Sequence, residues 1–83
     1  MTHKKLTIWD DHKKIITFIL NPCFLYKLES ISIGPRTSFS SKKIPTVPNK
    51  FIVLIRGVCI FDFLIFDNLE NAEKVYKEII AAL

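Results

Sequence analysis

The sequence predicts an α+β fold: a small, twisted, mostly antiparallel sheet of about four to five strands, with one C-terminal helix packed on a face. Residues 51–67, FIVLIRGVCIFDFLIFD, form the densest apolar run and are rich in β-branched and aromatic side chains. Residues 69–83 repeat apolar side chains every three or four positions, which is the period of a helix. With 83 residues the chain is long enough for one domain, so we expect a single domain over residues 1–83.

The first third of the chain predicts three strands. Alternating apolar and polar residues predict one strand over residues 5–9, and the apolar segment 15–20 predicts a second after a polar turn at residues 10–13. Asn21-Pro22 ends that strand, because proline donates no backbone hydrogen bond. Residues 24–29 fit a helical turn as well as the start of a strand. Residues 28–33 alternate again with Leu28 out of phase, which predicts a third strand with a bulge.

Residues 34–50 predict a long loop, because they contain several prolines and have no apolar period. Loops of this length in compact domains are usually functional or mobile. The segment is also basic, since it carries four cations and no acidic residue: Arg36, Lys42, Lys43 and Lys50. The net charge of +4 is therefore concentrated locally.

Residues 51–67 predict a hairpin that turns at Arg56-Gly57, with Gly57 in the positive-φ conformation that a tight turn needs. This register places Ile55 opposite Val58. Both faces of the hairpin are then apolar, so we expect it to be covered on both sides within the domain or buried by a second chain. The run is too short, and too interrupted by Arg56 and Asp62, to be a membrane span.

The C-terminal helix is expected over residues 68–83, with Asp67 and Glu70 forming a capping box at its start. A single helix covers about two strands on one face of a sheet. Apolar surface therefore remains, and either closure of the strands into a barrel or a second copy of the chain must cover it. We favour a homodimer.

The strongest candidate site is the basic loop, where hydroxyls, cations and free amides suit a phosphate or another anion. Phe39 is positioned in the same segment to stack on a base. The alternative is a solvated loop in which the lysines confer solubility and Phe39 caps the core. No P-loop or dinucleotide-binding glycine motif is present. The predicted anion-binding residues are Arg36, Thr37, Ser38, Ser40, Ser41, Lys42, Lys43 and Lys50.

The sequence favours a protein that is not an enzyme and that needs no metal or cofactor. Asp10, Asp11 and His12 are adjacent in a turn, so they are better explained as a polar turn than as a metal site. Cys59 lies within a predicted buried strand and lacks an assignable base. We interpret Cys59 and Cys23 as reduced, and the absence of a secretory signal as favouring a cytoplasmic location.

The order of an N-terminal hairpin, an ILNP break at residues 19–22, a later apolar hairpin and a terminal helix resembles several families of very small bacterial and phage proteins, FlbD-type flagellar proteins among them. The basic loop departs from that order, and the resemblance implies no function.

Two functions are therefore expected. The first is a small non-enzymatic binding protein whose basic loop holds a nucleotide, a phosphorylated metabolite or a nucleic-acid backbone. The alternative is a protein–protein interaction module, such as a small regulator or a phage-type inhibitor, that acts through an apolar sheet face.

Overall fold

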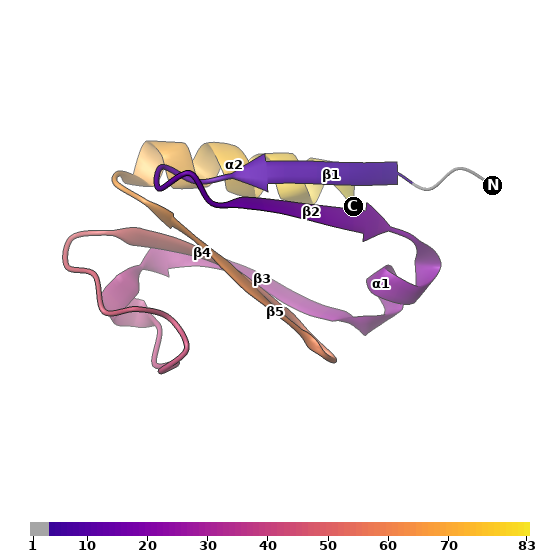
Figure 1. The fold of residues 1–83 in the computed structure, drawn as a ribbon, viewed down its shortest axis with the longest axis horizontal. Coiled ribbons are helices and arrows are strands. Elements are labelled where there is room, and N and C mark those ends of the chain that lie inside the picture. Colours follow the sequence, from indigo (N-terminus) through magenta and orange to yellow (C-terminus); the bar gives the residue numbers. More distant parts are fainter. Residues whose placement is uncertain (1–3) are drawn as a thin grey trace.

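The computed structural model describes residues 4–83 and has the predicted α+β architecture (Figure 1). Its elements in chain order are β1 (Lys4–Trp9), β2 (Ile15–Leu20), α1 (Pro22–Lys27), β3 (Leu28–Pro35), the 3-10 turn η1 (Arg36–Ser38), β4 (Phe51–Gly57), β5 (Ile60–Phe66) and α2 (Leu69–Ala82). Within this described part, neither helix combines the length and apolarity needed to cross a bilayer.

The strands form two antiparallel sheets, so the prediction of one sheet is wrong. β1 pairs with β2, and a separate three-stranded sheet has the order β3-β4-β5. Where the two sheets meet, side chains of the first hairpin bond to the edge of β5. The Asp10 carboxylate accepts a hydrogen bond from the Ile65 amide at 2.9 Å, and Lys14 Nζ donates to the Phe63 carbonyl at 2.9 Å. These bonds occupy backbone groups that a continuous ladder would have used.

The β4–β5 hairpin turns two residues later than predicted. Gly57 lies opposite Ile60 and Ile55 opposite Asp62, so the turn residues are Val58 and Cys59. The partner of Ile55 thus moves by an even number of positions, so the side chains predicted in the strands keep their faces, except Val58 and Cys59, which form the turn. The positive φ belongs to Cys59, at 60°, and Cys59 is exposed rather than part of a buried strand.

The glycine at position 57 is explained by close packing. A Cβ atom there would collide with the carbonyl oxygen of Lys27, which accepts a hydrogen bond from the Val58 amide at 2.9 Å. Gly57 therefore lets the end of β4 approach the junction between α1 and β3. The predicted bulge at this junction is confirmed, because the register of β3 shifts between Leu28 and Ser30.

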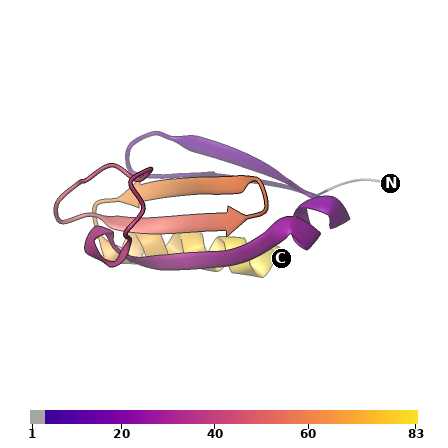
Figure 2. The ribbon, with the colours of Figure 1, turned by 90° about the horizontal axis from the view of Figure 1, so that it is seen from below.

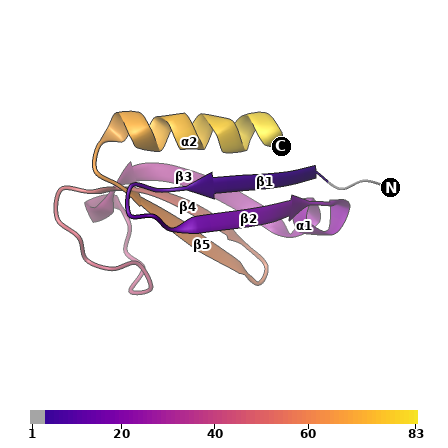
Figure 3. The ribbon, with the colours of Figure 1, turned by 45° about the horizontal axis from the view of Figure 1, so that its top comes forward.

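The main core lies between the three-stranded sheet and a layer made by α2 and the β1–β2 hairpin (Figure 3). Helix α2 contacts β1, β3, β4 and β5, so the hairpin and the helix together cover this sheet face. The buried side chains of this cluster are Ile8, Phe18, Val53, Ile55, Leu64, Phe66, Ala72 and Ile79.

The opposite face of the same sheet carries a second, smaller core beneath the long loop. Ile44 of the loop is 1% exposed and packs with Ile52 and Leu54, and Phe39 packs against the cluster. Figure 2 shows the loop beside one end of the sheet, with α2 on the other side. The loop covers this face only in part, because Ile52 and Leu54 are buried whereas Phe61, Phe63 and Ile65 of β5 are half-buried.

Both helices begin at asparagine caps. The Asn21 side chain accepts from the Phe24 amide at 2.8 Å, which starts α1; of the ambiguous residues 24–29, the first four are helical and the last two begin β3. The Asn68 side chain accepts from the Asn71 amide at 2.8 Å, so α2 is capped by Asn68 and not by Asp67 as predicted. Asp67 is then available for an ion pair.

Candidate functional site: a groove between the basic loop and the sheet

Arg36 organises the basic loop from within. Its guanidinium donates to the carbonyl oxygens of four residues in the segment 39–45: Nε to Pro45 at 2.7 Å, and the terminal nitrogens to Phe39 at 2.6 Å, Ser41 at 3.3 Å and Ile44 at 2.7 Å. The planar, multiply donating guanidinium suits this arrangement, in which one side chain bonds to several carbonyls. Arg36 is therefore a clamp that holds the loop together.

The clamped loop and the sheet enclose an open groove of about 580 Å³. The groove is lined by serine hydroxyls, two cationic side chains and two phenylalanine rings, and among its lining residues none is acidic. The lining residues are Ser32, Ile33, Ser38, Phe39, Ser40, Ser41, Lys43, Leu54, Arg56 and Phe61.

Strand register brings the floor of the groove together. In the pairing of β3 with β4, Ser30 lies opposite Arg56 and Ser32 opposite Leu54. In the pairing of β4 with β5, Arg56 lies opposite Phe61. Because side chains alternate along a strand, Ser32, Arg56 and Phe61 share the face that carries the loop.

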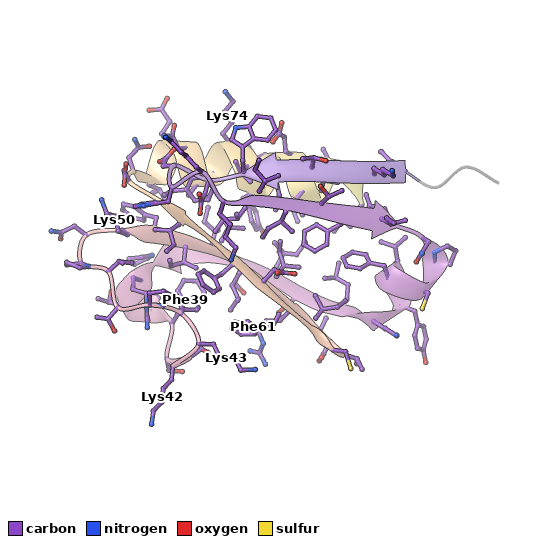
Figure 4. All side chains as sticks on the ribbon, in the orientation of Figure 1. Phe39, Lys42, Lys43, Lys50, Phe61 and Lys74 are labelled. Atoms are coloured by element: carbon purple, nitrogen blue, oxygen red, sulfur yellow. The ribbon has the colours of Figure 1, made fainter. Side chains whose placement is uncertain are left out.

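Lys43 reaches from the loop toward the floor. Its Nζ lies 5.0 Å from the centroid of the Phe61 ring, which is within cation–π range. Figure 4 shows Lys43 near Phe61, whereas Lys42 points away from the sheet at the tip of the loop. The Lys43 amide donates to Ser41 Oγ at 3.2 Å, which helps to fix the turn that directs Lys43 inward.

The structure brings together only part of the predicted site. Ser38, Phe39, Ser40, Ser41 and Lys43 line the groove. The remaining predicted residues do not line it: Arg36 clamps the loop, Lys42 is exposed, and Thr37 and Lys50 line a separate cavity of about 280 Å³.

Lys50 forms an ion pair with Asp67, with Nζ 2.8 Å from Oδ1. The hydrogen bond from Lys50 lowers the pKa of Asp67, and the nearby charges of Lys50 and of His12, whose Nε2 is 3.3 Å from the same oxygen, add to this effect. This pair ties the end of the loop to the segment between β5 and α2.

Sequence reasoning missed Ser32, Arg56 and Phe61. The strand over residues 28–33 was predicted, and its alternation places Ser30 and Ser32 on the face opposite to Ile31 and Ile33, which pack against the main core. Arg56 was assigned to the turn because of the glycine that follows it. Only the true register places it inside β4, opposite Phe61.

The remaining polar clusters have structural roles. The buried Asp10 carboxylate accepts from the amides of His12 at 2.8 Å, Lys14 at 3.0 Å and Ile65 at 2.9 Å. Asp11 accepts from the Asp67 amide at 2.9 Å, so this turn joins the first hairpin to the sheet. Across residues 4–83, no group of three or more His, Cys, Asp or Glu side chains could hold a metal ion.

The groove thus offers hydroxyl donors, two cations from different elements and ring surfaces to one ligand. Charge-assisted hydrogen bonds from such groups favour an anion. In comparisons with known proteins, no family model, no curated protein and no solved structure matches this chain.

Proposed function

We propose that this chain is a non-enzymatic binding protein whose groove holds a phosphate-bearing partner. The observation that carries the proposal is the convergence of Lys43 and Arg56 with four serine hydroxyls in one groove whose lining includes no acidic residue. An anion entering this groove meets cations that no adjacent carboxylate neutralises. Phosphate oxygens accept several hydrogen bonds at once, so the serines and both cations can bind one group together.

The two cations come from different elements, and this suits a ligand that lies between them. Lys43 belongs to the loop and Arg56 to β4. A phosphate that bonds to both would fasten the loop to the sheet and stabilise the clamped conformation. Among the lining residues, none is a carboxylate or an imidazole that could act as a general base, so the chemistry of the groove favours binding.

The proposal is tested by titrating the protein with tripolyphosphate, ATP and an oligothymidylate of about eight nucleotides, at low salt, by isothermal titration calorimetry. We expect at least one of these probes to bind. Lys43→Ala and Arg56→Ala should each weaken that binding about tenfold, which corresponds to about 1.4 kcal/mol and is within the range of charge-assisted hydrogen bonds.

Matched lysine variants separate the groove from general charge. Lys42→Ala removes the neighbouring exposed cation, and Lys74→Ala removes a cation on α2, distant from the loop in Figure 4. Each should change affinity less than about threefold, because exposed charges are screened by solvent and salt. Binding of none of the three probes, or equal losses in all four variants, would refute a groove-specific site.

A second candidate function is interaction with another protein through an apolar sheet face. The surface that favours it lies on the β1–β2 hairpin, and not on the 51–67 hairpin as expected from the sequence. One face of the 51–66 hairpin is buried in the main core and the other is partly covered by the loop, but the outward side of the β1–β2 hairpin is uncovered. Trp9 and Ile15 pair across the strands and are 62% and 67% exposed, and Ile19 further along β2 is 47% exposed. Exposed apolar patches of this kind often mark interaction sites.

For this second function we propose a homodimer in which two copies pack these hairpin faces together. The Trp9–Ile15 pair is apolar, and Lys5 lies at the other end of the face, so the pair can be buried without burying that charge. Sedimentation equilibrium at about 100 μM should then detect a dimer that Ile15→Ser dissociates. Ile80→Ser, at a similarly exposed position on α2, should leave it intact. A wild-type protein that stays monomeric contradicts this candidate.

A further inference from the structure

A second cation–ring pair lies next to the groove on the same strand. Lys14 Nζ is 3.9 Å from the centroid of the Phe63 ring. Phe63 is two residues beyond Phe61 on β5, so both rings share the face of the sheet that carries the loop. Their centroids are 6.5 Å apart at an interplanar angle of 68°. Two neighbouring rings, each with a lysine over its face, therefore lie along β5 beside the groove.

We infer that the partner is single-stranded nucleic acid, with bases stacked on Phe61 and Phe63 and the backbone held by Lys43, Arg56 and Lys14. This inference rests on the proposed function, because it assigns a ligand class to the same groove. Aromatic side chains beside a basic groove are the usual means of binding single strands, since every base has a flat face that can stack.

The binding surface extends further than a mononucleotide requires. Phe61 lines the groove and also lines a neighbouring cavity of about 540 Å³, which includes Lys14 and residues of β2. A strand that leaves the groove past Phe61 therefore meets a second recess and another cation. A single nucleotide would occupy the groove and leave Lys14 and Phe63 unused.

The lysines in the free protein occupy the positions that bases would take. A base that stacks on Phe61 or Phe63 must displace the ammonium of Lys43 or Lys14 from the ring. Each lysine has a flexible stem, so the displaced ammonium can turn to the adjacent phosphate, where the charge-assisted interaction is stronger. The exchange replaces a cation–π contact with both a stacked base and an ion pair, and at Lys14 it also breaks the hydrogen bond from Nζ to the Phe63 carbonyl.

One carboxylate constrains the route of the backbone. Asp62 lines the second cavity, and it lies opposite Ile55 on the core-facing side of β5. Because the Asp62 carboxylate repels phosphate, we expect the nucleic-acid backbone to pass on the side where Lys14 lies, next to the two phenylalanine rings. The groove lining offers serines and cations that suit phosphate, so binding should depend little on base sequence.

The test compares an oligothymidylate of about eight nucleotides with thymidine monophosphate and with inorganic polyphosphate of similar length, by fluorescence anisotropy and competition. We expect the oligonucleotide to bind at least tenfold more tightly than either. Contacts to three or four phosphates predict a slope of log affinity against log salt of about −2 to −3.

Two sets of variants assign the contacts. Phe61→Leu and Phe63→Leu should each weaken oligonucleotide binding about five- to tenfold while leaving polyphosphate binding unchanged. Tyr26→Leu, at a position 92% exposed on α1, is the aromatic control and should have no effect. Lys14→Ala should weaken the oligonucleotide and reduce its salt slope by about 0.7, with monophosphate affinity unchanged, whereas the neighbouring Lys13→Ala should change neither.

The outcomes separate the two claims. If thymidine monophosphate or polyphosphate binds as tightly as the oligonucleotide, or if Phe61→Leu and Phe63→Leu fold normally and bind it like the wild type, the nucleic-acid inference is wrong and the phosphate-binding function stands. If no phosphate probe binds at all, both are wrong. Thermal unfolding of each variant identifies any whose loss of binding reflects loss of structure.

Discussion

At the scale of single residues, Gly57 has a packing role that its neighbours in sequence do not reveal. The backbone of β4 approaches Lys27 so closely that a side chain at position 57 would strike the Lys27 carbonyl oxygen. That oxygen also receives the hydrogen bond from Val58, so it cannot move without loss. The tight turn itself is made by Cys59, which takes the positive φ.

We therefore predict that Gly57→Ala destabilises the fold by about 1–3 kcal/mol, because the added methyl group forces the backbone of α1 and β3 to shift. Chemical denaturation measures this difference. Gly34→Ala is the matched control: its new Cβ would meet only side-chain atoms of Phe39 and Ser38, at 3.8 Å, which is ordinary van der Waals contact. Equal stability of the two variants would mean that the close approach to Lys27 does not exist.

At the scale of elements, the 36–50 loop has its own stabilising contacts although it contains little regular structure. Arg36 draws the carbonyls of residues 39–45 around its guanidinium, and Ile44 anchors the loop on the sheet. These contacts give the groove a fixed wall and direct Lys43 toward Phe61. The cationic loop is thus preformed before any ligand arrives, which lowers the entropy cost of binding.

We predict that Arg36→Lys loosens the loop, because a lysine ammonium cannot bond to four carbonyls in the same arrangement. Limited trypsin digestion should cut after Lys42 and Lys43 several times faster in this variant, since cleavage follows local opening. Thr37→Ala alters the adjacent exposed residue and should digest like the wild type. A wild-type cleavage rate in Arg36→Lys would show that the Arg36 guanidinium does not hold the loop closed.

At the scale of the whole molecule, the two sheets are joined by the turn between β1 and β2 as well as by the core. The Asp10 carboxylate bonds to two amides within the turn and to the Ile65 amide of β5, and Asp11 bonds to the Asp67 amide. Asp10 is 7% exposed, so removal of its carboxylate would leave poorly solvated amides without a partner.

We predict that Asp10→Ala lowers the free energy of unfolding by about 2–4 kcal/mol and that Asp10→Asn lowers it less, because the one remaining oxygen can still accept from the His12 and Lys14 amides. Urea denaturation measures both. Glu73→Ala, an exposed acidic position on α2, should change stability by less than about 0.5 kcal/mol. If Asp10→Ala matches Glu73→Ala, the Asp10 hydrogen bonds do not contribute to joining the sheets.

Only part of the candidate site could be predicted from the sequence, because some of its residues lie in one segment and others are brought together by strand pairing. Ser38, Ser40, Ser41 and Lys43 were found because they lie together in one basic segment. Arg36 belongs to the same segment, but its hydrogen bonds to loop carbonyls give it a different role. Ser32 and Phe61 lie on strands that reach the groove only through pairing with β4, which no local pattern specifies.

By itself the sequence determined the α+β class, the approximate positions of the strands and the terminal helix, the bulge near Leu28 and the faces of residues 51–55 and 60–63. These features depend on periodicity and local propensity, which act over a few residues. Only the tertiary structure decided that the strands form two sheets, that the hairpin turns at Val58-Cys59, and that Arg56 and Phe61 meet the basic loop. Those features depend on approaches between segments distant in the chain, such as Gly57 to Lys27 and Asp10 to Ile65, whose energies arise only when the backbone is folded.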